Sequence, residues 1–230
     1  MKNKITKMIC LLIFSLLVGC SSDDSKVVSG TLEFSEIGSH TFEIDADAIE
    51  ATITVIGGGG GGGGGTSYNS GNSSTGGGGG GGAGEVKTFT DVTLQKNVTY
   101  TVVVGAGGVG GSAGSFGLNG QPSSVSLELT TLHSALVGNG GAGNVPNQTS
   151  GGNGGTGFPA GTAGGSGVLK NLNGNATAGT GGAGGNNSSA YGNGGNGGNG
   201  AGLSNSIPTN AFPGSNGGSG YVRIEWTGRE

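Results

Sequence analysis

The feature that most limits what this chain can fold into is a glycine-rich tract between residues 57 and 220. It opens with nine consecutive glycines at 57–65, continues with a second run at 76–82, and then thins into Gly-Gly-X repeats. Glycine loses more backbone freedom on ordering than any other residue and has no side chain to bury. The tract therefore either stays disordered or is ordered by something other than a hydrophobic core.

The residues that separate the glycine pairs recur at every third position. Asn193, Asn196 and Asn199 show this step, as do Thr180 and Ala183. Three residues per turn is the period of the polyproline II helix, whereas an α-helix has a period near 3.6 and a strand a period of 2. In that helix a Gly-Gly-X segment has two bare edges, along which neighbours can approach and bond through their N–H and C=O groups. The spacing predicts a bundle of polyglycine II helices.

Two other structures compete with the bundle. Collagen needs glycine at every third position and abundant proline, but here glycine fills two positions of three and the chain has 5 prolines. A flexible Gly/Ser/Asn linker fits the composition, although a linker does not need the strand-like segments that interrupt this tract. In a bundle, Gly195 lies on a bare edge and Asn196 on the decorated edge, so only substitution of the glycine should be severe. A linker would tolerate both changes.

The segments before, between and after the glycine-rich stretches alternate apolar with polar residues and are rich in Val, Ile and Thr, which is typical of β-strands. They lie at 31–34, 40–44, 51–56, 85–90, 98–104, 125–129, 132–137 and 221–226. Short strands over this range predict one all-β domain at 30–228, a sandwich or barrel with the glycine segments inserted between strands. The last strand is expected to pair with the early ones.

The N-terminus has the features of a lipoprotein signal peptide. Three lysines precede an apolar stretch at 8–18 that is too short to span a bilayer. Leu-Val-Gly-Cys at 17–20 matches the bacterial lipobox, so we expect a signal peptide at 1–19, a lipid on Cys20 and a lipidated tether at 20–29. Several acyl chains on one residue give stable membrane anchoring.

The residues after Cys20 bear on location. Serine at position 21 resembles the pattern of outer-membrane lipoproteins, and the pair Asp23-Asp24 resembles an acidic signal for surface export. We therefore expect an outer-membrane protein that faces outward, although a solvated tether would also explain the acidic pair.

The charge distribution limits the partners. Loss of the three N-terminal lysines changes the net charge of −4 to −7, which disfavours nucleic acid and anionic lipid surfaces as partners. Between Glu128 and Arg223 the only charged residue is Lys170. Recognition by the tract would therefore depend on shape, amides and aromatic rings.

Four blocks, at 51–60, 81–86, 100–108 and 218–226, resemble in sequence and order the bacterial and phage glycine-rich domain family. The domain is similar to the glycine-rich region of anaplastic lymphoma kinase, which implies a tumour-necrosis-factor-like sandwich or jelly roll with polyglycine II loops. The likeness to polyglycine II phage tail adhesins implies receptor binding. The sequence contains no kinase, transmembrane helix or tail-fibre shaft, and the adhesins' binding loops are hypervariable, so no binding residue is carried over.

The enzyme motifs in the chain are weak. Gly105, Gly107 and Gly110 follow a strand as in a dinucleotide-binding loop, but the residues after them cannot form the required helix. His40 and His133 are the only histidines, too few for a zinc site, and both cysteines lie at or before the lipobox. We expect no catalytic residue, cofactor or metal, and His133 to be a strand-face residue.

Aromatic residues in the tract are the remaining candidates for contact with a partner. Tyr68 and Tyr191 are the best binding candidates, because each sits among Asn and Ser. The other aromatic residues of the tract are Phe116, Phe158 and Phe212. The alternative is that each ring anchors its loop onto the sandwich. The sequence favours a surface-anchored, non-catalytic, adhesin-like module that binds a glycan or cell-surface protein. A structural coat or assembly subunit without a specific ligand is the other interpretation.

The lipid anchor is directly testable. Changing Cys20→Ser removes the thiol that accepts the diacylglycerol, so the precursor should stay uncleaved by the lipoprotein peptidase and take up no labelled palmitate. Incorporation of palmitate into this variant would show that the lipobox interpretation is wrong.

Overall fold

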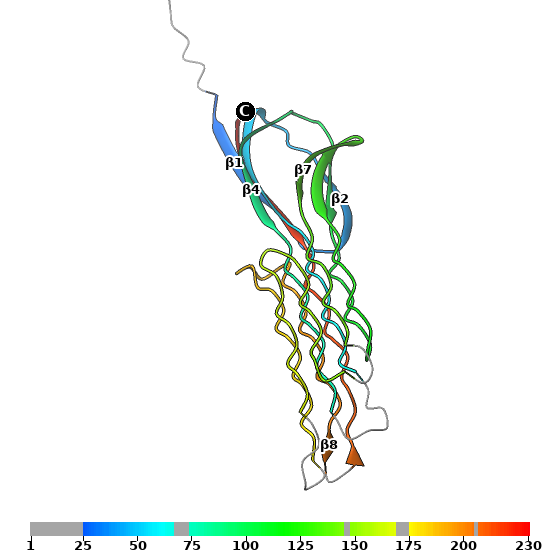
Figure 1. The fold of residues 1–230 in the computed structure, drawn as a ribbon. Coiled ribbons are helices and arrows are strands. Elements are labelled where there is room, and N and C mark those ends of the chain that lie inside the picture. The colour runs from blue at the N-terminus through cyan, green and yellow to red at the C-terminus, as the bar shows by residue number, and fades with distance from the viewer. Residues whose placement is uncertain (1–24, 67–73, 145–147, 169–174, 205–206) are drawn as a thin grey trace, which may run out of the picture.

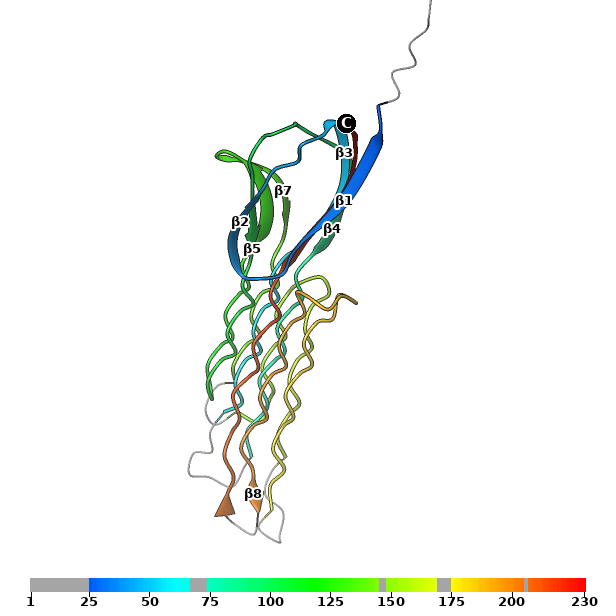
Figure 2. The ribbon, with the colours of Figure 1, turned by 180° about the vertical axis from the view of Figure 1, so that it is seen from behind.

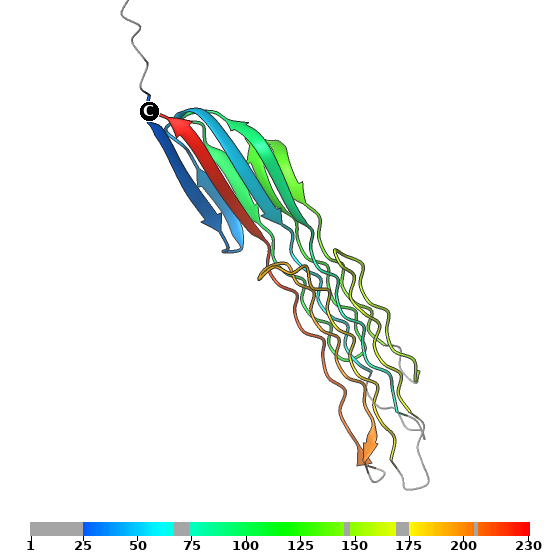
Figure 3. The ribbon, with the colours of Figure 1, turned by 90° about the vertical axis from the view of Figure 1, so that its left-hand side faces the viewer.

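The computed structural model describes residues 25–66, 74–144, 148–168, 175–204 and 207–230, which form a β-sandwich and a long bundle of glycine-rich segments. The bundle extends from one end of the sandwich, and the two parts follow one another along a single long axis (Figures 1 and 3). The described residues contain no α-helix. The expected all-β fold is confirmed.

The sandwich consists of two antiparallel four-stranded sheets, visible as two layers in Figure 2. One has the order β1-β10-β3-β4 and the other β2-β5-β6-β7. The strands are β1 (Val27–Phe34), β2 (Gly38–Phe42), β3 (Asp47–Ile56), β4 (Val86–Leu94), β5 (Tyr100–Val104), β6 (Ser123–Leu127), β7 (Thr130–Ala135) and β10 (Tyr221–Arg229). Because β10 lies between β1 and β3, the expected return of the last strand to the first ones is confirmed.

The core lies between the sheets and follows from the period-2 pattern. In β3, Ile53 and Val55 are fully buried whereas Thr52 and Thr54 point outward, and in β10 Val222 and Ile224 are fully buried. Burial of such a side chain contributes roughly 1.5–3 kcal/mol. The apolar core therefore belongs to the sandwich, and the bundle must be stabilised in another way.

Several strand boundaries in the structure differ from the predicted ones. β1 begins at Val27, inside the segment 20–29 expected to be the tether, because Val27 pairs with Arg229 at the end of β10. The predicted strand 125–129 ends early, since Glu128 has a φ of 51° in the turn before β7. A small hairpin, β8 (Leu203–Ser204) and β9 (Ile207–Pro208), was not predicted, because strands of 2 residues show no alternation.

Two isoleucines test where stability resides. Ile224 is fully buried in the core, whereas Ile207 in β9 is 69% exposed. Ile224→Ala should lower the free energy of unfolding by about 2–5 kcal/mol. Ile207→Ala should change it by no more than about 0.5 kcal/mol. Denaturant unfolding of both variants checks this, and equal effects would contradict the assignment of the core.

Candidate functional site

The bundle is the part of the molecule that distinguishes it from an ordinary sandwich. Its segments run along the long axis and are joined side by side by backbone hydrogen bonds. The bonding pattern arranges them in three layers. One layer contains 115–121, 136–144 and 150–158; the middle layer contains 105–114, 57–66, 74–85 and 159–168; the third contains 176–186, 192–201 and 212–220.

The nine glycines at 57–65 form an interior helix with neighbours on all sides. Every third N–H group donates to the same antiparallel neighbour, and every third carbonyl accepts from the same parallel neighbour, with N···O distances of 2.8 to 3.2 Å. The antiparallel neighbours are 79–85, 115–121 and 212–218, and the parallel ones are 108–114, 138–144 and 195–201. This step of three confirms the predicted polyglycine II period.

The same contacts explain why this run contains nothing but glycine. A Cβ built on any of residues 57–65 would lie 1.9 to 2.2 Å from a backbone carbonyl oxygen of a parallel neighbour. At Gly62, for example, it would lie 2.0 Å from the carbonyl oxygen of Asn196. The second run, 76–82, is the other interior helix and meets carbonyl oxygens at the same 1.9 to 2.2 Å. Uninterrupted glycine therefore marks the helices that are surrounded.

The Gly-Gly-X segments are the peripheral helices. Their X side chains, such as Asn153, Thr180 and Asn196, are exposed, whereas Gly195 is buried and a Cβ there would lie 2.1 Å from the carbonyl oxygen of Ser215. The predicted division into bare and decorated edges is confirmed.

The decorated asparagines have a second role that sequence reasoning missed. The Oδ1 of Asn196 accepts from the Gly184 N–H, and that of Asn199 accepts from the Gly181 N–H, both at 2.8 Å. On the opposite layer, Asn119 accepts from the Gly140 N–H at 2.9 Å. These N–H groups point away from the bundle, so the side chains satisfy donors that no further helix reaches. The three-residue spacing of Asn193, Asn196 and Asn199 was the available signal.

The aromatic candidates fall into different environments. Tyr191 is half-buried at the sandwich end of the bundle and stacks on Tyr221 of β10, with ring centroids 4.5 Å apart. This contact is what the anchoring alternative expects, and a binding role for Tyr191 stays a prediction. Burial, followed by a hydrogen bond to Glu33 and the charge of that carboxylate, raises the pKa of Tyr221 to about 12. Tyr68 lies outside the described residues.

The three phenylalanines do not pack into the sandwich core. Phe116 is 69% exposed, Phe212 is 58% exposed and Phe158 is 45% exposed. Phe116 and Phe212 lie beside the far end of segment 57–66, where Gly65 donates to the Phe212 carbonyl. Phe158 lies near the sandwich, since its N–H donates to Ala83. Two exposed rings therefore sit in the far half of the bundle.

The two ends of the molecule differ. Val27 and Arg229 pair at the end of the sandwich away from the bundle, whereas β8 marks the far end of the bundle (Figure 1). Ile207 of β9, at that far end, is largely exposed. The first described strand and the free end of the bundle are thus at opposite ends of the long axis.

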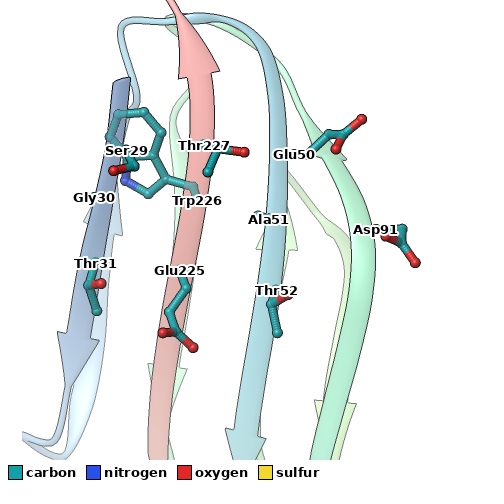
Figure 4. Close-up of a pocket in the computed structure, with 10 residues that line it drawn as sticks. All are labelled: Ser29, Gly30, Thr31, Glu50, Ala51, Thr52, Asp91, Glu225, Trp226 and Thr227. Atoms are coloured by element: carbon teal, nitrogen blue, oxygen red, sulfur yellow. The ribbon is translucent and has the colours of Figure 1, made fainter. Parts of the chain in front are cut away.

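A surface groove of about 540 Å³ lies on the sheet of β1, β10, β3 and β4 (Figure 4). The exposed carboxylates of Glu50, Asp91 and Glu225 line it together with threonine hydroxyls. The Trp226 indole lies against Gly30, where a Cβ would be 2.7 Å from its Nε1.

The described residues include no group of three His, Cys, Asp or Glu side chains that could hold a metal ion, and no helix that could cross a membrane.

The glycines and histidines that were considered as enzyme motifs pack within the bundle and the sandwich. Gly107 of the Gly105–Gly110 motif packs in the bundle, where a Cβ would lie 2.0 Å from the carbonyl oxygen of Gly217. His133 lies on β7 with its ring centroid 4.3 Å from that of Phe89, and burial lowers its pKa. His40 on β2 hydrogen-bonds through Nε2 to the Glu36 carbonyl at 2.7 Å.

The structure is a β-sandwich whose strand connections form a hydrogen-bonded bundle of glycine-rich helices. The model of the glycine-rich domain family matches residues 34–227, so the chain belongs to that family. A search of curated proteins found no match. The tumour-necrosis-factor-like topology that the resemblance implied stays a prediction.

The order of the tract can be tested at adjacent positions. Gly195→Val should lower the free energy of unfolding by at least about 3 kcal/mol, because the new side chain would overlap the Ser215 carbonyl. Asn196→Ala should cost only about 0.5–1.5 kcal/mol, since water can replace its Oδ1 at the Gly184 N–H. Thermal unfolding with limited proteolysis measures both. Equal and negligible effects would be the result expected of a flexible linker.

Proposed function

We propose that this protein is a lipid-anchored outer-membrane lipoprotein that acts as a non-catalytic, adhesin-like binding module facing outward. The observation that carries the proposal is the position of the N-terminal strand. β1 begins at Val27, at the end of the sandwich opposite the far end of the bundle. Six residues lie between Cys20 and Val27 in the sequence, so the distance from Cys20 to Val27 is at most about 25 Å. A lipid on Cys20 would hold the sandwich near the membrane and project the bundle away from it.

The bundle suits presentation of a surface to a partner. Its interior helices are bonded on all sides, so it can hold a distant surface in a fixed orientation without a hydrophobic core. Segment 57–66 alone has a length of roughly 30 Å at the rise of a three-residue helix. The ring of Phe212 is exposed in the far half of the bundle, away from the end that the lipid would hold.

The chemistry of this part supports an uncharged or weakly charged partner. The bundle exposes amides, hydroxyls and aromatic rings, and Lys170 is the only charged residue between Glu128 and Arg223. A glycan or a neutral patch of a cell-surface protein fits such a surface, whereas a nucleic acid would need clustered basic side chains.

Surface display and binding can be tested together. Antibody labelling of intact cells should detect the protein, and replacing both Asp23 and Asp24 by Ala should reduce this labelling while total protein stays level. The full chain, purified in mild detergent, should show one saturable partner on panels of glycans and cell surfaces.

Two outcomes would count against the proposal. Absence of labelling on intact wild-type cells would contradict outward display. If the protein is displayed but binds nothing saturably and assembles into arrays, the structural-coat interpretation would replace the adhesin-like one.

A further inference from the structure

The third layer of the bundle presents a face with unusual hydrogen-bonding chemistry. We call it the asparagine face and define it by Thr180, Ala183, Asn196, Asn199 and Phe212. Segment 192–201 runs along its middle, flanked by 176–186 and 212–220. All five defining side chains are exposed. A ligand could therefore lie across three neighbouring helices at once.

Two asparagine amides on this face are fixed in orientation. The Oδ1 atoms of Asn196 and Asn199 are held at 2.8 Å by the N–H groups of Gly184 and Gly181. An amide side chain has one acceptor oxygen and two N–H donors on its nitrogen. With the oxygen bonded to the bundle, each NH₂ group is directed toward solvent. Neither has a protein acceptor among the described residues.

Asn193, the next residue of the same row, is different. Its Oδ1 accepts from the Asn187 N–H at 3.1 Å, and its Nδ2 donates to the Ser189 carbonyl at 2.8 Å. Both ends of this amide are therefore used within the protein. The open donors are confined to the part of the row nearer the far end, and they lie one turn apart, or about 9 Å at 3.1 Å per residue.

An exposed aromatic ring completes the arrangement. Phe212 donates its N–H to the Asn199 carbonyl at 2.9 Å, so the two residues are lateral neighbours. Ser215 lies one turn along on the same edge, and its Oγ is 2.7 Å from the Asn196 nitrogen. The Phe212 side chain has the equivalent place beside Asn199 and is 58% exposed. The face thus combines two oriented donors with one aromatic platform.

These features specify the chemistry of a ligand. It must supply hydrogen-bond acceptors at intervals, offer an apolar surface to an aromatic ring, and carry no charge, because no charged residue lies on this face. A neutral polysaccharide has hydroxyl and ring oxygens as acceptors and C–H faces that pack on aromatic rings. Donors already fixed in place lose little conformational freedom on binding, which favours affinity.

We propose that a neutral polysaccharide chain binds along the asparagine face, with Phe212 packed under one sugar ring and the amides of Asn196 and Asn199 donating to two different units of the chain. This inference rests on the proposed binding function and assigns it a ligand class and a surface. It places recognition on the side of the bundle, where the helix lattice holds the donors rigidly.

The opposite layer provides a matched control. Asn119 is held by the Gly140 N–H at 2.9 Å, and Phe116 is 69% exposed. However, the neighbouring Asn139 donates its Nδ2 to Thr156 Oγ1 at 2.6 Å. Among the described residues, that layer therefore has no second amide fixed in this way next to Asn119, and it should not bind a polymer in the same way.

The test is affinity electrophoresis of the full chain in mild detergent, through native gels containing dextran, laminarin or xyloglucan, with alginate as an anionic comparison. Mobilities are compared with gels that contain no polysaccharide. Asn199→Asp keeps an acceptor for the Gly181 N–H but has no donor, and Phe212→Ala removes the ring. Each should weaken binding to a neutral polysaccharide about tenfold or more, with the thermal midpoint nearly unchanged. Asn119→Asp and Phe116→Ala should leave binding unchanged.

Several results would overturn the proposal. Retardation by none of the neutral polysaccharides, or equal losses for the two faces, would remove the asparagine face as the site. A shift from dimer to monomer in Asn199→Asp, measured by light scattering, would assign the face to a second copy of this chain. If the protein binds cells saturably and these variants do not alter that binding, the proposed function stands and this surface is wrong.

Discussion

The structure depends on one interaction, the lateral hydrogen bond between glycine backbones that approach without Cβ atoms. Each interior glycine donates to one neighbour and accepts from another, and successive residues turn by a third of a revolution to reach the next pair. A methyl group at Gly62 would overlap the Asn196 carbonyl at 2.0 Å. The lattice thus satisfies buried backbone groups as a β-sheet does, but on all sides of a helix.

Such a lattice has a high entropic cost, because ordering the backbone of one residue costs about 1–2 kcal/mol and glycine loses more conformational entropy than any other residue. A net hydrogen bond contributes only about 0.5–1.5 kcal/mol. The sandwich reduces this cost by holding the segment ends in register. Segment 57–66 leaves β3 and segment 74–85 returns to β4, while 105–114 and 115–121 link β5 with β6 in the same way. Apolar burial in one part therefore supports a bundle that has no apolar core.

The side chains at the edge of the lattice complete its hydrogen bonding and also form the proposed ligand surface. An outer helix has N–H groups that no further helix reaches, and like those of a sheet edge they could recruit another chain. Asn196 and Asn199 block this by accepting from Gly184 and Gly181, and in doing so they turn their own donors outward. The same side chains that end the lattice create the surface that we assign to a ligand. Because that surface is neutral, its selectivity must come from geometry.

The sequence by itself determined the period of three, the bare and decorated edges, the core strands and the all-β class, since each is a local repeat. It also predicted that β10 returns to the early strands. It did not reveal that the two uninterrupted glycine runs are the surrounded helices, because the number of neighbours depends on how distant segments pack. The asparagine caps, the stacking of Tyr191 on Tyr221 and the exposure of Phe212 were likewise decided by tertiary structure. These features depend on how different segments pack against one another. The repeat within one segment does not indicate which other segment lies beside it.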